Sequence, residues 1–129
     1  MKKGFTLIEV IIVLTLIGIM VAIIVPIYRN SVIRAREAVL KENLFHIRDA
    51  ISKYYYDKQK YPTSLDDLVT DKYLSKLPID PITNSDDWEI VHFEPVDMED
   101  FDPEIAEGII DVKSKSEMQS LEGTSYSDW

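Results

Sequence analysis

The chain has 129 residues, a formal net charge of -9 and no cysteine, so it has room for one small domain beside any membrane segment. The acidic excess argues against a nucleic-acid partner, because phosphate binding needs clustered Lys and Arg. The lack of cysteine excludes disulfides, thiolate metal ligands and a thiol nucleophile. No pairing of a nucleophile with a base is indicated in the sequence, so we expect a protein that is not an enzyme.

The first predicted element is an apolar helix over Phe5 to Tyr28. Residues 10–25 carry no charge, and the whole segment spans ~36 Å at ~1.5 Å per residue, enough to cross a hydrocarbon core of ~30 Å. No small-residue cleavage site follows it, which argues against a secretory signal peptide. Lys2-Lys3 and the basic stretch Arg29 to Lys41 flank the segment, which suits contact with anionic lipid headgroups.

A carboxylate, Glu9, lies near the start of this apolar segment. An unpaired charge in the middle of a bilayer costs ~2.5–3.5 kcal/mol or more, so an acid in this position indicates a function. The alternative is that Glu9 lies close enough to the end of the segment to snorkel to the interface.

The residues around Glu9 carry a specific motif. The run Lys2-Lys3-Gly4-Phe5-Thr6-Leu7-Ile8-Glu9 resembles the class III leader of type IV pilins and type II secretion pseudopilins. The resemblance implies that a prepilin peptidase removes residues 1–4 by cutting between Gly4 and Phe5, and that Phe5 is then N-methylated. It also implies that Glu9 of an incoming subunit pairs with the Phe5 amine of a subunit already in the filament, which sets the register.

Two residues, Gly18 and Pro26, interrupt the apolar helix. Proline removes a backbone donor and crowds the preceding turn, so we expect a kink or local melting around Ala22 to Pro26. A harmless kink is the alternative, since Pro and Gly are frequent in membrane helices. The resemblance implies that a stretch between Gly18 and Pro26 can unwind on assembly.

Residues 29–57 are expected to continue the helix outside the membrane as an amphipathic half. Apolar side chains at helical spacing form one stripe, which consists of Ile33, Leu40, Leu44, Ile47, Ile51 and Tyr54. The opposite face carries Arg34, Lys41, Glu42, Arg48, Asp49 and Lys53. Glu37 falls on the apolar seam, which weakens the case for a coiled coil. We therefore expect the stripe to pack on a small sheet of the same chain.

Residues 58–129 are expected to form the globular head. Ser64 with Asp67 three residues later predicts the capped start of a short second helix. Trp88 to Glu94 alternates as a strand and Gly108 to Lys113 is its expected antiparallel partner. The acidic stretch between them, Pro95 to Glu107, is expected to be a surface loop.

The predicted fold is therefore α+β and pilin-like. A long N-terminal helix, first transmembrane and then amphipathic, packs against a small antiparallel sheet with one short extra helix. The corresponding domain boundaries are residues 1–4 for the leader, 5–28 for the transmembrane and filament-core helix, 29–57 for the amphipathic half and 58–129 for the head.

The head carries an ordered set of motifs: Tyr61-Pro62, a short leucine-rich helix, Leu77-Pro78, Asp80-Pro81 and a strand that begins at Trp88. This order resembles the major pseudopilin of type II secretion, the G family. In that family an Asp-rich C-terminal loop binds calcium, which implies a site formed by Glu117, Glu122 and Asp128. The closely spaced Asp pattern is missing here, so the alternative is a polar loop pinned by Tyr126 and Trp129.

Together these resemblances imply a structural subunit of a type II secretion pseudopilus. It would form a helical homopolymer at the bacterial inner membrane to drive protein export, with a single pass and a periplasmic head. The implied partners are minor pseudopilins or pilins, the prepilin peptidase, the inner-membrane assembly platform and membrane lipid. One alternative is a pilin of an extracellular type IV pilus for adhesion, motility or DNA uptake, and another is a singly anchored binding module. The missing cysteine pair, common in pilin heads, favours the pseudopilin.

Overall fold

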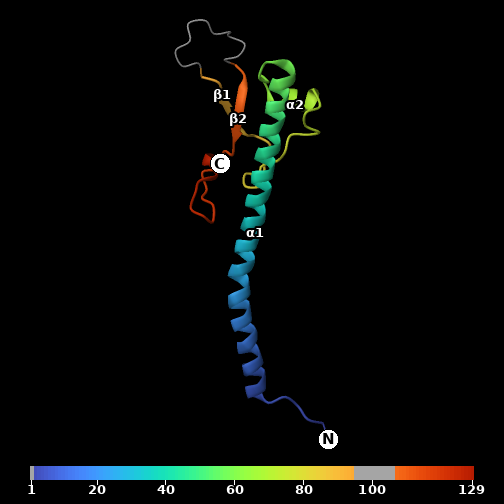
Figure 1. The fold of residues 1–129 in the computed structure, drawn as a ribbon. Helices are drawn as coiled ribbons and strands as arrows, with labels where there is room; N and C mark the ends of the chain where they lie inside the picture. Colours follow the sequence, from blue (N-terminus) through green and yellow to red (C-terminus); the bar gives the residue numbers. More distant parts are fainter. Residues whose placement is uncertain (1, 95–106) are drawn as a thin grey trace. The chain divides into compact units, whose positions relative to one another are not determined.

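The computed structural model describes residues 2–94 and 107–129, which divide into two compact units, Met1–Ala35 and Arg36–Trp129. The elements in chain order are helix α1 (Leu7–Lys58), helix α2 (Leu65–Thr70), strands β1 (Glu89–His92) and β2 (Ile109–Lys113), and a short 3-10 helix (Tyr126–Asp128) (Figure 1). This set confirms the predicted α+β class. The surface loop expected over Pro95 to Glu107 lies outside the described residues except for its last residue.

The part of α1 in the first unit is long and apolar enough to cross a membrane. Every residue from Lys2 to Ser31 is exposed. The helix continues without a break through Gly18 and Pro26, so the local melting expected before Pro26 is wrong for this structure. The helix persists because Pro26 removes only one backbone donor while the flanking turns keep theirs. A kink at Pro26 stays a prediction.

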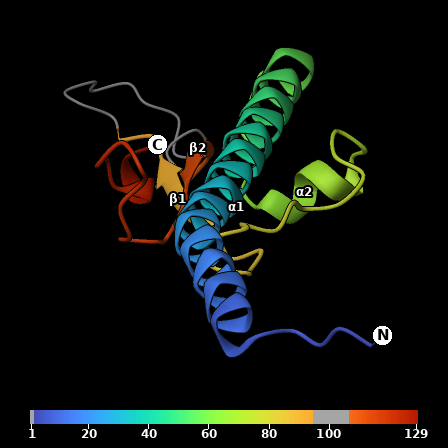
Figure 2. The same cartoon turned by 90° about the horizontal axis from the view of Figure 1, so that it is seen from below.

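The second unit is built around the apolar stripe of α1. Leu40, Leu44, Ile47, Ile51 and Tyr54 are all buried, as the helical spacing predicts, whereas Ile33 is half-buried. The side chains that cover the stripe come from both sides of α1 and include Leu65, Leu68, Trp88, Ile109, Val112 and Tyr126. Figures 1 and 2 show the sheet and α2 on opposite sides of this half of α1.

Helix α2 begins at the capping box that the sequence predicts. The amide of Ser64 donates to the Asp67 carboxylate at 3.0 Å, and the Ser64 hydroxyl accepts from the Asp66 amide at 3.2 Å. These bonds satisfy donors that a helix start leaves without a partner. The cap orients α2 so that Leu65 and Leu68 face the core.

The sheet consists of β1 and β2, paired antiparallel from Glu89 opposite Lys113 to His92 opposite Ile109. Strand β1 is shorter than the sequence predicts. Trp88 lies just ahead of it, is buried, and donates its indole N–H to the carbonyl of Pro78 at 2.9 Å. Trp88 therefore ties the proline-rich loop to the sheet.

Asp80 organises that loop from the inside. It is 1% exposed, and its carboxylate accepts the amide of Ile82 at 2.7 Å and the hydroxyl of the buried Ser114. Because Ser114 directly follows β2, this carboxylate joins the loop to the end of the sheet. A buried carboxylate is tolerated only when such donors surround it.

Replacing Asp80 by Ala should lower the free energy of unfolding by about 2–3 kcal/mol, because it leaves buried donors without an acceptor. Trp88 fluorescence during denaturant unfolding measures the change. The matched control is Asp86→Ala, at an exposed position of the same loop, which should stay within about 0.5 kcal/mol of the parent. Equal stabilities of the two variants would contradict this role of Asp80.

Candidate functional site

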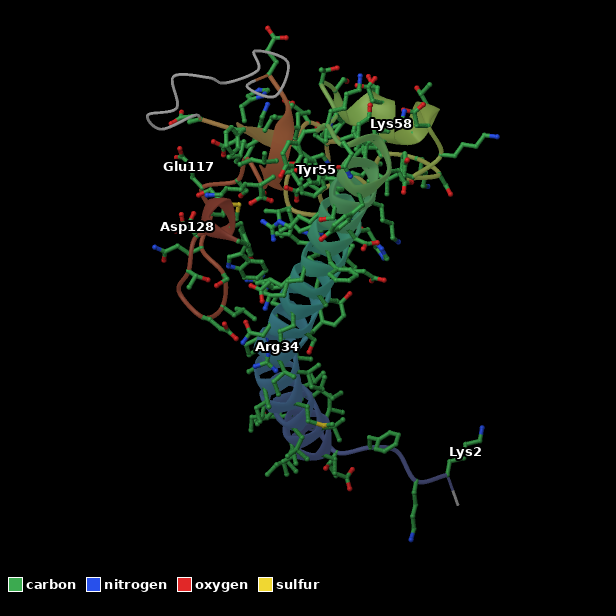
Figure 3. The ribbon with its side chains drawn as sticks, turned by 45° about the horizontal axis from the view of Figure 1, so that its top comes forward. Lys2, Arg34, Tyr55, Lys58, Glu117 and Asp128 are labelled. Atoms are coloured by element: carbon green, nitrogen blue, oxygen red, sulfur yellow. The ribbon has the colours of Figure 1, made fainter. Side chains whose placement is uncertain are left out.

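The chain ahead of α1 is open on all sides. Residues 2–6 are not helical, and Phe5 is 90% exposed. A Cβ placed on Gly4 would meet nothing within 4 Å. Figure 3 shows the segment leading away from α1 towards Lys2. The peptide bond between Gly4 and Phe5, the predicted cleavage point, is therefore accessible to an enzyme that needs extended backbone.

Glu9 has a partner within its own first turn. The Thr6 amide donates to Glu9 Oε2 at 2.7 Å, and the Glu9 amide donates to Thr6 Oγ1 at 3.3 Å. This reciprocal pair is a capping box, and the positive end of the helix dipole adds to its stability. The sequence carries the signal of this cap, a Thr followed three residues later by Glu ahead of an apolar run. The partner predicted for Glu9 was the Phe5 amine, and the cap was not predicted.

The surroundings of Glu9 are otherwise apolar. A hollow in the surface brings the carboxylate beside the side chains of Phe5, Val10, Ile12, Val13 and Leu14. A carboxylate at the edge of an apolar surface interacts more strongly with a cation than one in water does. An ammonium group could therefore pair with the Glu9 carboxylate in this hollow when other apolar surface excludes water from it.

A second cluster lies where α1 meets the C-terminal segment, residues 114–129. Glu37 is buried on α1, and its Oε1 accepts both the Leu121 amide and the Tyr126 hydroxyl, each at 2.9 Å. From the sequence, Glu37 is expected on the apolar seam, but no partner for it is predicted. A lone acid within an apolar stripe is the signal that could have predicted a buried hydrogen-bonded carboxylate.

Arg48 joins the same segment to the sheet. Its Nε donates to Asp111 Oδ1 at 2.6 Å, and its Nη2 donates to the main-chain oxygens of Val112 at 3.1 Å and Trp129 at 2.8 Å. Arg48, which the sequence places opposite the apolar stripe, is half-buried rather than fully exposed. The reason is that a guanidinium can reach three acceptors at once and is stable when half-buried among them.

The C-terminal segment is pinned by Tyr126 and Trp129, as one of the two alternatives from the sequence expects. Trp129 donates its indole N–H to Thr124 Oγ1 at 2.9 Å, and the Lys41 ammonium lies 4.5 Å from its ring centroid. The two aromatic rings meet edge to face at 5.1 Å. These contacts fix the segment from both the α1 side and its own turn.

The other alternative requires calcium on Glu117, Glu122 and Asp128. All three side chains are exposed, and Figure 3 shows Glu117 and Asp128 on the C-terminal segment. Among the described residues, no three His, Cys, Asp or Glu side chains are grouped so as to hold a metal ion. Because calcium needs ~6–8 converging oxygens, the arrangement of these three side chains does not fit a calcium site.

Comparisons with known proteins give a match to one family model and matches to several relatives. The family model described as the prokaryotic N-terminal methylation motif matches residues 1–25. Over 99 residues the chain is 33% identical to the type II secretion system core protein G of Pseudomonas aeruginosa, which covers 64% of this chain and 70% of that protein. For core protein G of Klebsiella michiganensis, the identity is 27% over 96 residues, 62% and 68% of the two chains.

Pilins are also similar, over a shorter stretch. The chain is 38% identical over 64 residues to the type IV major pilin protein PilE1 of Neisseria gonorrhoeae, which covers 48% of this chain and 38% of the pilin. No solved structure matches the chain. The similarity to the G proteins therefore extends further along the sequence than the similarity to this pilin.

The hydroxyl of Tyr126 gives a pH-dependent signature of the C-terminal cluster. Burial first, and then the hydrogen bond to Glu37, raise the pKa of Tyr126 from 10.0 to about 12. Because the folded-state pKa lies above the unfolded value, this contribution to stability is complete below pH ~10 and is lost as the pH rises through ~12. Denaturant unfolding between pH 9 and 12 should show this decline.

In Tyr126→Phe the decline should be shallower, since the titrating group is gone. Tyr56→Phe, at a side chain that is 75% exposed, is the control and should keep the full slope. Identical slopes in all three proteins would contradict the assignment to Tyr126.

Proposed function

The chain belongs to the family of type II secretion system core protein G, and on that basis we propose that it is a pseudopilin, a structural subunit that polymerises at the bacterial inner membrane to drive protein export. The observation that carries the proposal is the exposed apolar half of α1 with a capped carboxylate at its start. Apolar surface of this extent is stable only in lipid or against other copies of itself.

The proposed topology has a single pass. Residues 1–4 form the leader, 5–28 the span, 29–57 the amphipathic half and 58–129 a head in the periplasm. The family membership supports this orientation. The charge balance does not decide it, because Lys2 and Lys3 precede the span while the basic stretch Arg29 to Lys41 follows it. After assembly the apolar segment becomes the filament core, and the proposed kink at Gly18 and Pro26 lets it adjust.

Processing begins with a prepilin peptidase that cuts between Gly4 and Phe5. Glycine suits the residue before the cut, because it lets the backbone extend into a narrow cleft, and the exposure of this segment supports access. Cleavage removes Lys2 and Lys3 and turns the Phe5 amide nitrogen into an α-amine, which is then methylated. The new ammonium lies in the same apolar surroundings as Glu9.

Assembly then exchanges the partner of Glu9. In the uncut chain its carboxylate accepts the Thr6 amide of its own turn. In the filament the carboxylate of an incoming subunit pairs with the Phe5 ammonium of an earlier one. An unpaired charge in the apolar core is costly and a paired one is tolerated, so the pair selects one register. Minor pseudopilins and the assembly platform are the proposed partners of this step.

A pilin of an extracellular type IV pilus is the second candidate, because a pilin matches with 38% identity over 64 residues. Deletion of the gene separates the two. Loss of exported proteins from the medium supports the pseudopilin, whereas loss of surface filaments with normal export supports the pilin.

Processing gives a direct test. Protein from membranes should begin at methyl-Phe5, whereas Gly4→Val should keep Met1, because a branched side chain hinders entry of the scissile bond into the peptidase. Intact mass and N-terminal sequencing measure both. The control Gly18→Ala should be cut normally. An intact Met1 on the parent protein would favour an ordinary membrane anchor instead.

The role of Glu9 is tested separately. Glu9→Ala should be cleaved normally, yet its filament yield should fall about tenfold or more, since a loss of ~1.4 kcal/mol already changes an equilibrium tenfold. Sheared filaments and cleaved subunits are quantified from the same cells. Glu42→Ala, an exposed acid on the same helix, should assemble like the parent. Normal filament yield from Glu9→Ala would remove the register role.

A further inference from the structure

Hydrogen bonds within the C-terminal segment, and from the segment to α1, hold it in place. Its turn is formed by backbone bonds from Ser120 to Thr124 at 2.7 Å and from Tyr126 to Met118 at 3.0 Å. Gly123 allows this turn, because its φ of 83° lies in the left-handed region that favours glycine. The carbonyl oxygens of Thr124 and Met118 therefore already accept hydrogen bonds within the segment.

The hydroxyl oxygens of the turn are also engaged. The Ser120 and Thr124 hydroxyls pair at 2.9 Å, and Thr124 Oγ1 additionally accepts the indole N–H of Trp129 at 2.9 Å. An oxygen that already accepts a hydrogen bond has less capacity to coordinate a metal ion. The exposed Glu117, Glu122 and Asp128 supply acceptors, but they are not gathered at the turn.

On the α1 side, donors from the segment converge on an anion. The Leu121 amide and the Tyr126 hydroxyl both point at one oxygen of the buried Glu37. This is the electrostatic reverse of a calcium site, in which oxygens converge on a cation. Two hydrogen bonds to a charged acceptor are individually stronger than neutral ones, so Glu37 can position the segment without a metal ion.

The neighbouring cations strengthen the same conclusion. A pocket between α1 and the segment is lined by Lys41, Leu44, Arg48, Glu122, Thr124 and Trp129. Both basic side chains of this pocket already contact Trp129. The Lys41 ammonium lies over the Trp129 ring, and Arg48 donates to the main-chain oxygen of Trp129. A divalent cation entering there would meet two positive charges and one carboxylate.

We infer that the carboxylate of Glu37 takes the place of a bound calcium ion as the group that positions the C-terminal segment, so that the head folds and is stable without metal. Glu37 is thus a positioning residue within the head. The inference concerns the isolated subunit and holds whether or not the proposed filament function is correct.

The first test uses the full chain in detergent micelles, with the melting temperature (Tm) followed by tryptophan fluorescence. Excess EGTA and then 2 mM calcium chloride should leave the Tm unchanged to within about 1 °C. The Leu121 amide should keep the same hydrogen-exchange protection in both conditions. A rise of several degrees with calcium, or loss of Leu121 protection in EGTA, would overturn the inference.

The second test removes the carboxylate. Glu37→Ala should lower the Tm by roughly 12 °C or more, the shift that loss of two hydrogen bonds to a charged group gives in a domain of this size. Glu37→Gln keeps an acceptor oxygen and should recover at least half of that loss. The exposed Glu42→Ala is the matched control and should shift the Tm by no more than about 2 °C.

Local exchange separates positioning from general destabilisation. In Glu37→Ala, protection of the Leu121 amide should fall at least tenfold at temperatures where the core amides of β2 remain protected. If that variant does not fold, Tyr126→Phe removes only one donor and should give about half the Tm shift. The role of Glu37 would be refuted if the Leu121 amide of Glu37→Ala were as protected as in the parent. If Glu37→Ala does not fold, a parent-like Tm of Tyr126→Phe would refute it.

Discussion

A carboxylate in an apolar setting needs hydrogen-bond donors or a cation, and both units of the chain contain one such carboxylate. Glu9 lies at the start of an exposed apolar helix, where its partner is the amide of Thr6. Glu37 lies on the same helix but within the head, where Leu121 and Tyr126 satisfy it. The difference is that the capping bond of Glu9 is local and exposed and can be exchanged, whereas the bonds of Glu37 close a buried contact.

The dominant periodic signals were sufficient to predict the architecture. The uncharged run over residues 10–25, the stripe from Leu40 to Tyr54 and the Ser64–Asp67 cap each depend on neighbours in sequence, and each is present in the structure. The Thr6–Glu9 cap is equally local and was recognisable in principle. This cap was not predicted, because the role implied by the resemblance, pairing with the Phe5 amine, already accounted for Glu9.

The long-range contacts were beyond the sequence. Nothing in residues 37–48 indicates that Arg48 reaches Asp111 and Trp129 or that Glu37 meets Tyr126, since these pairs are separated by more than sixty positions. The calcium expectation is of the same kind. It depended on the calcium loop of the G family, whereas in the structure donors converge on an acid of α1. Only the folded arrangement of donors distinguishes the two cases.

The boundary between Ala35 and Arg36 separates two kinds of surface. Before it, the side chains of α1 are exposed from Leu7 to Ser31, and their proposed partners lie outside the chain, in lipid or in other copies. After it, the buried core begins at Leu40 and is completed by the head's own residues. Substitutions in the head can therefore be compensated within one subunit, whereas in the proposed homopolymer a change in the first part appears in every subunit at once. The family model for the N-terminal motif lies wholly within that first part, over residues 1–25.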